Sequence, residues 1–239
     1  MELKNLTPKD IENMNYNQLI GIVKETNRIP GGRNTILEII NKLCLTKQSK
    51  ILEIGTSTGF TSIEISRFLK CQIIAIDIND QSLEEARKRA LDLDYNNINF
   101  INADINNLPF KDNDFDLVIV GNILSLLTNK DKSLNECRRV CKKEGFILAV
   151  PMYYIKSPPE EIVSKVSEAI GTEIKIWDKE FWTSLFEQIS EDYGTKIELY
   201  YSKDFVYKDR NKFIDDYVGI VLNKNSLKGL SEEMKKKTK

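Results

Sequence analysis

Histidine is absent from this chain of 239 residues. Without an imidazole, the protein has no Ser-His-Asp or Cys-His centre, no histidine general base and no histidine-ligated metal. Whatever chemistry it carries out must rely on carboxylates, tyrosine, lysine, backbone dipoles or the positioning of reactants. We therefore expect no metal cofactor.

Cysteine is scarce, and its spacing does not suggest redox chemistry. The chain has four cysteines and no CxxC pair, and its polar start does not resemble a secretory signal, so we expect free thiols that pack as small apolar residues. Cys137 and Cys141 stand one helical turn apart, a spacing that also suits half of a metal site, although packing is the favoured interpretation. The other two are Cys44 and Cys71.

Long apolar runs and a charge excess are also missing. No run approaches the roughly 18 residues that a membrane span needs. Lysine plus arginine (35) balances aspartate plus glutamate (36), so no overall field attracts nucleic acid or an anionic membrane. We expect a cytoplasmic protein with neither nucleic-acid nor membrane partners, and the oligomeric state stays open.

The hydrophobic pattern divides the chain into three parts. Residues 1–48 carry two helical patterns around the turn Pro30-Gly31-Gly32, which predicts an N-terminal helical cap. In residues 49–150, strands expected at 51–55, 72–77, 97–104, 116–120 and 145–150 alternate with helices from about 59, at 82–93 and at 134–143. This alternation predicts an α/β fold whose parallel sheet is covered on both faces and binds ligands at the carboxyl ends of its strands.

The last part, residues 151–239, has a looser pattern. A helix is expected at 159–170, an aromatic stretch covers 176–188, a strand is expected at 196–205, and 217–223 suits either a strand or a helix. We interpret this part as the substrate side of the same domain.

The sequence ILEIGTSTGFTS is the densest chemical signal. Gly55 and Gly59 allow a tight turn between a strand and a helix, and the helix start offers free amide donors. Asp77 ends the next strand, where a carboxylate can accept both hydroxyls of a ribose. Taken singly, the glycines suit an ordinary turn and Asp77 a helix cap; together they indicate an adenosine-containing cofactor.

These motifs resemble, over residues 50–150, the class I S-adenosylmethionine (SAM)-dependent methyltransferases. LEIGTSTG resembles the first motif of that family, with Ser57 where glycine is commoner, and AIDIND resembles the second. INADINNLPFKDNDFDLVIV resembles the third and fourth motifs together. ECRRVCKKEGFILAV resembles the segment that follows them, with Glu144 where proline or glycine is usual. The resemblance implies a Rossmann-like, mostly parallel sheet of seven strands. It implies cofactor contacts at Glu53, Gly55, Thr56, Ser57, Gly59, Asp77, Ile78, Ala103, Asp104, Ile105, Gly121 and Asn122.

The implied activity is metal-independent methyl transfer from SAM to a small-molecule acceptor. GNIL follows the fourth strand where an NPPY-type motif would indicate amino groups of bases or glutamine, and no run of carboxylates there suits a hard cation. A protein or RNA acceptor, or a SAM-binding module without catalysis, stays as an alternative. An NAD(P)-dependent oxidoreductase fits less well, because the spacing is GxxxG rather than GxGxxG.

Acceptor contacts are assigned more loosely, and no general base is assigned. Candidates are Tyr16, Arg28 and Arg33 in the cap and Tyr153 and Tyr154 after the fifth strand; the Gly31-Gly32 turn also suits a plain connection, and Arg33 a solvated charge. Met152, Trp177, Phe181 and Trp182 could line an apolar pocket. Phe181, Trp182, Leu185 and Phe186 fall at helical spacing, which favours core packing for these four.

Overall fold

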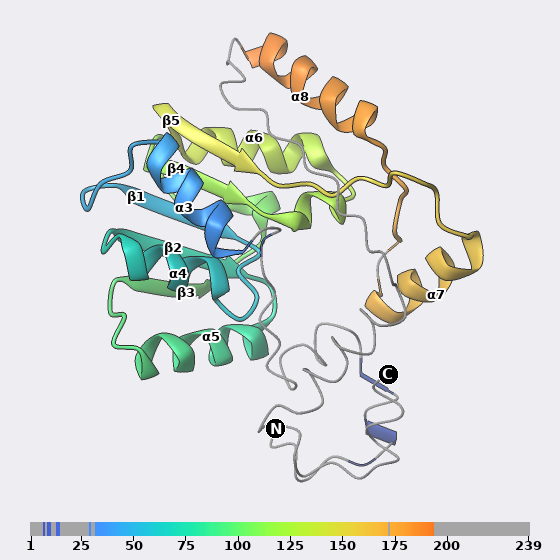
Figure 1. Cartoon of the computed structure of the whole chain (residues 1–239), viewed down its shortest axis with the longest axis horizontal. Coiled ribbons are helices and arrows are strands. Elements are labelled where there is room, and N and C mark those ends of the chain that lie inside the picture. The colour runs from blue at the N-terminus through green and yellow to red at the C-terminus, as the bar shows by residue number, and fades with distance from the viewer. Residues whose placement is uncertain are drawn as a thin grey trace.

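The computed structural model describes residues 7, 9–10, 13–14, 29, 32–171 and 173–193. Five parallel strands form one sheet in the order β3-β2-β1-β4-β5 (Figure 1). The strands are β1 (Lys50–Ile54), β2 (Gln72–Asp77), β3 (Ile98–Asn102), β4 (Phe115–Val120) and β5 (Cys141–Ala149). The helices are α3 (Arg33–Lys42), α4 (Phe60–Phe68), α5 (Asp80–Asp92), α6 (Lys130–Val140), α7 (Glu160–Ile170) and α8 (Lys179–Tyr193), with short 3-10 turns η2 (Ile105–Asn107) and η3 (Asn122–Ser125).

The sheet forms because its strands are nearly continuous runs of buried β-branched and aliphatic residues, as expected for a parallel sheet covered on both faces. Alternate residues of each strand point to opposite faces. On one face Ile51 and Ile73 pack with α3 and α4, and on the other Leu52 and Ile74 pack with α6 and α8. Figure 1 shows these helices as two layers around the sheet.

The prediction of an α/β fold with a parallel sheet is confirmed, and the described part contains five strands of the seven expected. The segments at 196–205 and 217–223, where the other two strands were sought, lie outside the described residues. So does the first helix of the predicted cap, whereas α3 is its second helix. None of the described helices is long and apolar enough to cross a membrane.

The boundary between α6 and β5 differs from the sequence prediction. The helix ends at Val140 and the strand begins at Cys141, whereas the pattern predicted a helix to 143 and a strand from 145. Cys141 pairs with Phe115, and a register shift follows before the next pairs form. Gly145 fits inside this irregularity because an added Cβ would stand 3.0 Å from the carbonyl oxygens of Phe115 and Asp116. Contacts across strands therefore set this boundary.

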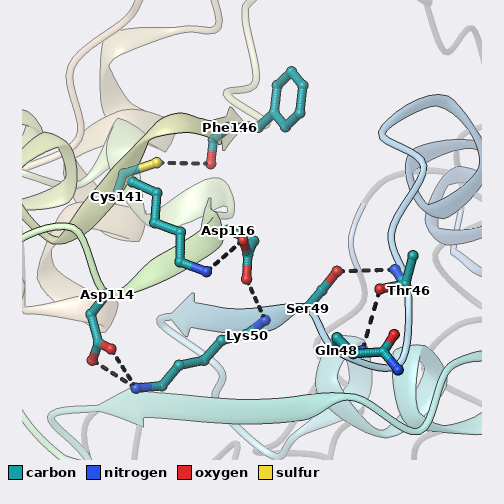
Figure 2. Close-up of polar contacts among 9 residues, drawn as sticks. Thr46, Gln48, Ser49, Lys50, Asp114, Asp116, Cys141 and Phe146 are labelled. Carbon is teal, nitrogen blue, oxygen red and sulfur yellow. Dashed lines mark hydrogen bonds and ion pairs between the residues drawn. The ribbon is translucent and has the colours of Figure 1, made fainter.

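The amino ends of β1 and β4 are held together by charges (Figure 2). The Lys50 backbone N–H donates to Asp116 at 2.8 Å, and the Lys50 ammonium donates to both oxygens of Asp114 at 2.7 Å. Lys142 donates to the second oxygen of Asp116 at 2.7 Å. Burial acts to raise the pKa of Asp116, but the hydrogen bonds from the Lys142 ammonium and the Lys50 backbone N–H outweigh it, so the pKa is lowered. These contacts hold together the amino ends of the two strands. The candidate site lies at the opposite edge of the sheet, where the carboxyl ends of the strands meet.

The thiols of Cys71, Cys137 and Cys141 are buried, and Cys44 is exposed. Burial raises the pKa of Cys137 to about 12 and that of Cys141 to about 11, so both are neutral thiols near pH 7. Cys137 lies in the core beneath α6, which supports the packing interpretation over a metal half-site. Within the ranges that the structure describes, no cluster of three or more potential metal ligands occurs.

Candidate functional site

The turn between β1 and α4 has an unusual backbone. Three of its residues have a positive φ: Gly55 (76°), Ser57 (50°) and Gly59 (81°). The backbone N–H groups of Gly55 and Thr56 both donate to the carbonyl of Ile76, at 2.9 and 3.0 Å. These two bonds hold the turn against the end of β2, which brings the first and second motifs together.

Both glycines of the turn are also required by close contacts. A Cβ on Gly55 would collide with the Ile123 side chain of η3, and one on Gly59 would stand 3.0 Å from the Ala86 Cβ of α5. At both positions the positive φ would strain any residue with a side chain, and the backbone packs directly against the neighbouring elements. The glycine turn is thus a close-packed cradle at the carboxyl edge of the sheet.

The buried carboxylate of Glu53, on β1, holds this turn through hydrogen bonds. Its side chain is 5% exposed and lies on the helix-facing side of β1. The carboxylate accepts hydrogen bonds from the Thr56 hydroxyl at 2.8 Å, from the Ser62 backbone N–H at 3.0 Å and from the Ser62 hydroxyl. Gly59 cannot cap α4 with a side chain, so Glu53 provides that cap from the strand. Burial raises the pKa of Glu53.

Asp77 ends β2 beside the turn. One carboxylate oxygen accepts from the Ser57 N–H at 2.8 Å and the other from the Asn79 N–H at 3.0 Å, which fixes the orientation of the group. Burial raises the pKa of Asp77, and these backbone hydrogen bonds lower it in part. Ile78 follows with 69% of its surface exposed. An oriented acid next to an exposed apolar side chain suits a ribose that carries a flat base.

The ends of β3 and β4 complete the edge. The Ala103 N–H donates to the Asp77 carbonyl at 3.2 Å, which places Asp104 next to the β2 end. Asp104 is exposed and uses one carboxylate oxygen to cap η2 through Asn106. The Ile105 side chain is 5% exposed and belongs to the core.

Gly121 and Asn122 follow β4 and lead into η3, with the Asn122 side chain exposed. The twelve residues predicted to contact the cofactor therefore lie on or just after the carboxyl ends of β1 to β4. Glu53, Thr56 and Ile105 are turned largely inward, at 5%, 2% and 5% exposed, and Ser57 is buried too.

The predicted acceptor residues are more scattered. Tyr16 and Arg28 lie outside the described residues. Arg33 is held by Glu64 of α4, its guanidinium donating to both carboxylate oxygens, one at 3.0 Å, and this ion pair fastens α3 to the core. Tyr153 packs against the core, and the Tyr154 N–H donates to the Trp177 carbonyl at 2.9 Å. The segment after β5 is thereby joined to the aromatic stretch.

The aromatic stretch packs largely as its spacing predicted. Trp182 is 4% exposed, and Phe181, Leu185 and Phe186 pack around it on the core. The Trp182 indole N–H donates to the Met152 carbonyl at 3.1 Å. Sequence reasoning missed Lys130, whose ammonium lies 4.7 Å from the ring centre of Trp177. Nothing in the sequence marks this lysine, because the contact arises only where α6 meets α8.

Comparison with known proteins places this arrangement in a family. A model of the family described as "Methyltransferase domain" matches residues 45–197, which include all five strands. The chain belongs to the methyltransferase domain family. Membership implies SAM as the cofactor. It agrees with the resemblance seen in the motifs.

Individual members of the methyltransferase domain family match parts of the chain. The "Ubiquinone/menaquinone biosynthesis C-methyltransferase UbiE" of Pseudomonas putida (strain W619) is 34% identical over 124 residues, which cover 51% of this chain and 47% of that protein. The chain thus spans about half the length of such curated relatives.

Solved structures show the same fold. The crystal structure of MccD protein matches with a TM-score of 0.60 and 29% identity, covering 68% of this chain and 72% of that one. A putative sarcosine dimethylglycine methyltransferase from Galdieria sulphuraria has a TM-score of 0.65 and 16% identity, covering 86% and 75% of the two chains, and so supports the fold alone.

The residues at the carboxyl edge fit SAM. Gly55 and Gly59 let the turn pack closely against η3 and α5, and nothing lies within 4 Å of the place where a Gly121 Cβ would stand, so this edge is open beside Gly121. Asp77 is an oriented acceptor for ribose hydroxyls, and Ile78 is an exposed apolar surface for adenine. Donors, acceptors and apolar surface are thus present in the order that an adenosine-containing ligand requires.

Proposed function

We propose that this protein is a SAM-dependent methyltransferase that acts on a small organic acceptor without a metal ion. The main support for this proposal is that the glycine turn is hydrogen-bonded to the end of β2 at one edge of the sheet. The Ser57 N–H donates to the Asp77 carboxylate, and two further backbone N–H groups of the turn donate to the Ile76 carbonyl. Family membership and the order of the motifs support it.

Each element has a distinct task in this proposal. The Asp77 carboxylate binds the ribose, Ile78 and Ala103 flank the adenine, and Asp104 accepts from its amino group. Gly121 leaves room for the chain that carries the sulfur, and Gly55 and Gly59 shape the turn beside it, with Thr56, Ser57 and Asn122 along the same edge. Glu53 and Ile105 act indirectly, by holding the turn and the core under it.

When bound, SAM supplies a methyl group on a sulfonium sulfur; a lone pair of the acceptor forms the new bond to carbon while the carbon–sulfur electron pair stays on sulfur. The protein's own part is to orient both partners and exclude water. This chemistry needs no histidine, in accord with the composition.

A small acceptor is supported by the kind of relative that matches and by the chain's balanced charge. The Pseudomonas relative is named for carbon methylation in quinone biosynthesis, which concerns a small molecule. The atom that is methylated here stays open between oxygen, nitrogen, sulfur and carbon.

Isothermal titration with SAM, with its demethylated product S-adenosylhomocysteine, and with NADH tests the cofactor. We expect the first two to bind and NADH not to bind. Asp77→Ala should weaken SAM binding by about 1.5–3 kcal/mol, as for the loss of a charged hydrogen-bond partner. Asp92→Ala, at an exposed acid that ends α5, should match the wild type. Binding of NADH with none of SAM would overturn the proposal.

A further inference from the structure

Lys130 is the first residue of α6, and its side chain lies against two tryptophans at and just before the start of α8. Its ammonium lies 4.7 Å from the ring centre of Trp177 and 5.8 Å from that of Trp182, and donates to the Leu127 carbonyl at 2.8 Å. Figure 1 shows α8 beside α6 here. An ammonium has three N–H donors, so two remain beyond the Leu127 bond. No carboxylate in the described stretches forms an ion pair with it.

A second donor beside Lys130 lacks an acceptor. The indole N–H of Trp177 is buried, and no acceptor for it occurs within the described part of the chain. Leaving such a group unsatisfied is unfavourable. Phe181 stacks on the Trp177 ring at 3.9 Å between centroids, so the ring is held in place and the N–H direction is fixed.

The surroundings are positive rather than neutral. Burial lowers the pKa of Lys130, and repulsion from Lys175 lowers it further. Asp178 lies next to the cluster in sequence, but its carboxylate accepts the Phe181 N–H at the start of α8. Within the described residues, no carboxylate therefore pairs with the Lys130 ammonium, and no acceptor bonds the Trp177 N–H.

The cluster also lies on the acceptor side of the fold. Lys130 follows β4 and η3, and the Trp177 carbonyl accepts from Tyr154, which comes shortly after β5. In an open parallel sheet, ligands bind beyond these carboxyl ends. The proposed cofactor contacts lie at the ends of β1 to β4 as far as Asn122, which leaves the region beyond η3 and after β5 for the acceptor.

We propose that Lys130 and Trp177 form an anion-recognition site for the acceptor, so that the methyltransferase takes an organic acid whose carboxylate or ring oxyanion accepts from the ammonium and the indole N–H. This inference rests on the proposed function, because it assigns the acceptor class of that same site. An oxyanion placed between the two groups would accept from both donors and balance the charge of the Lys130 ammonium.

The two tryptophans of the chain are Trp177 and Trp182, so all tryptophan fluorescence reports on this cluster. Benzoate and pentafluorophenolate, at constant ionic strength and with or without saturating S-adenosylhomocysteine, provide the carboxylate and ring-oxyanion probes. Benzamide, which has nearly the same shape as benzoate but no charge, is the control ligand. Calorimetry on the same samples detects any binding that leaves the fluorescence unchanged.

We expect at least one anion to bind saturably and benzamide to bind about tenfold more weakly or worse. Lys130→Met should reduce anion affinity by about tenfold or more, and Trp177→Phe, which keeps the stacked ring, by several-fold. Lys132→Met, at an exposed lysine of α6, should behave as wild type. Equal affinity for benzoate and benzamide, unchanged affinity in Lys130→Met, or no anion binding by calorimetry would overturn the inference.

The cofactor titration separates this inference from the proposed function. A protein that binds S-adenosylhomocysteine but neither anion refutes the anion site alone. A protein that binds no SAM and no S-adenosylhomocysteine refutes the proposed function, whatever the anions do.

Discussion

The Ser57 backbone N–H donates to the Asp77 carboxylate at 2.8 Å, so the acid that ends β2 and the turn that follows β1 form one unit. Asp77 is therefore oriented before any ligand arrives. Each carboxylate oxygen has a second lone pair, and these remain for the two ribose hydroxyls.

The affinity for SAM should fall as the solution is made acidic. Burial raises the pKa of Asp77, so its carboxylate takes up a proton at a higher pH than an ordinary aspartate. The protonated group loses acceptor capacity, and affinity drops as the pH falls through this raised pKa. Titration calorimetry across the acidic range measures the effect. Asp77→Asn should bind weakly with a flat profile; a profile as steep as wild type would place the titrating group elsewhere.

Glu53 should be a structural requirement with a pH signature. Glu53→Ala should lower the free energy of unfolding by about 2–4 kcal/mol, because the Ser62 N–H loses its buried acceptor. Since the folded-state pKa of Glu53 is raised, the folded protein holds more protons than the unfolded chain between the two pKa values, and stability falls as pH rises through that window.

Glu53→Gln should flatten this part of the stability profile, measured by urea unfolding at several pH values. Glu84→Gln, at an exposed acid of α5, is the matched control. A slope that survives in Glu53→Gln would show that another group titrates there.

Ser57→Gly should stabilise the protein by up to about 1 kcal/mol. Ser57 has a φ of 50°, a conformation that costs a non-glycine residue about 1–2 kcal/mol, partly offset by the greater freedom of glycine in the unfolded chain. Thermal unfolding gives the value. Asn113→Gly, at an exposed residue with a φ of 54°, should change stability little because asparagine tolerates this region. Clear destabilisation by Ser57→Gly would reveal a role for the hydroxyl.

Gly145→Ala should destabilise the protein by about 1–3 kcal/mol, because its Cβ would press on the backbone of β4 as well as on the Cys141 sulfur at 2.9 Å. The free energy of urea unfolding measures the change. Lys143→Ala, at an exposed residue of β5, provides the control for stability. Equal stability of the two variants would mean that the strand irregularity adjusts without cost.

The order of strands and helices was predictable because each buried strand is a short apolar run bounded by turn signals. The glycine turn was predictable too, because its conformation requires particular residue types. The role of Glu53 as a cap for α4 was not, since the strand pattern does not show which face meets the helix. The Lys130 contact with Trp177 depends on tertiary packing between residues far apart in sequence.

β5 is the last strand of the described sheet, and within the described residues only β4 pairs with it. In the described part of the chain no strand pairs with its outer edge, and Ile147 on this strand is 41% exposed. Such an edge is a template for pairing between molecules. A chain cut after Tyr193 should therefore self-associate as its concentration rises, visible by light scattering, because it would lack the segment at 196–205, whose sequence favours a strand, and the segment at 217–223, which suits a strand or a helix. The C-terminal part of the chain would then be what keeps one molecule from adding to the sheet of another.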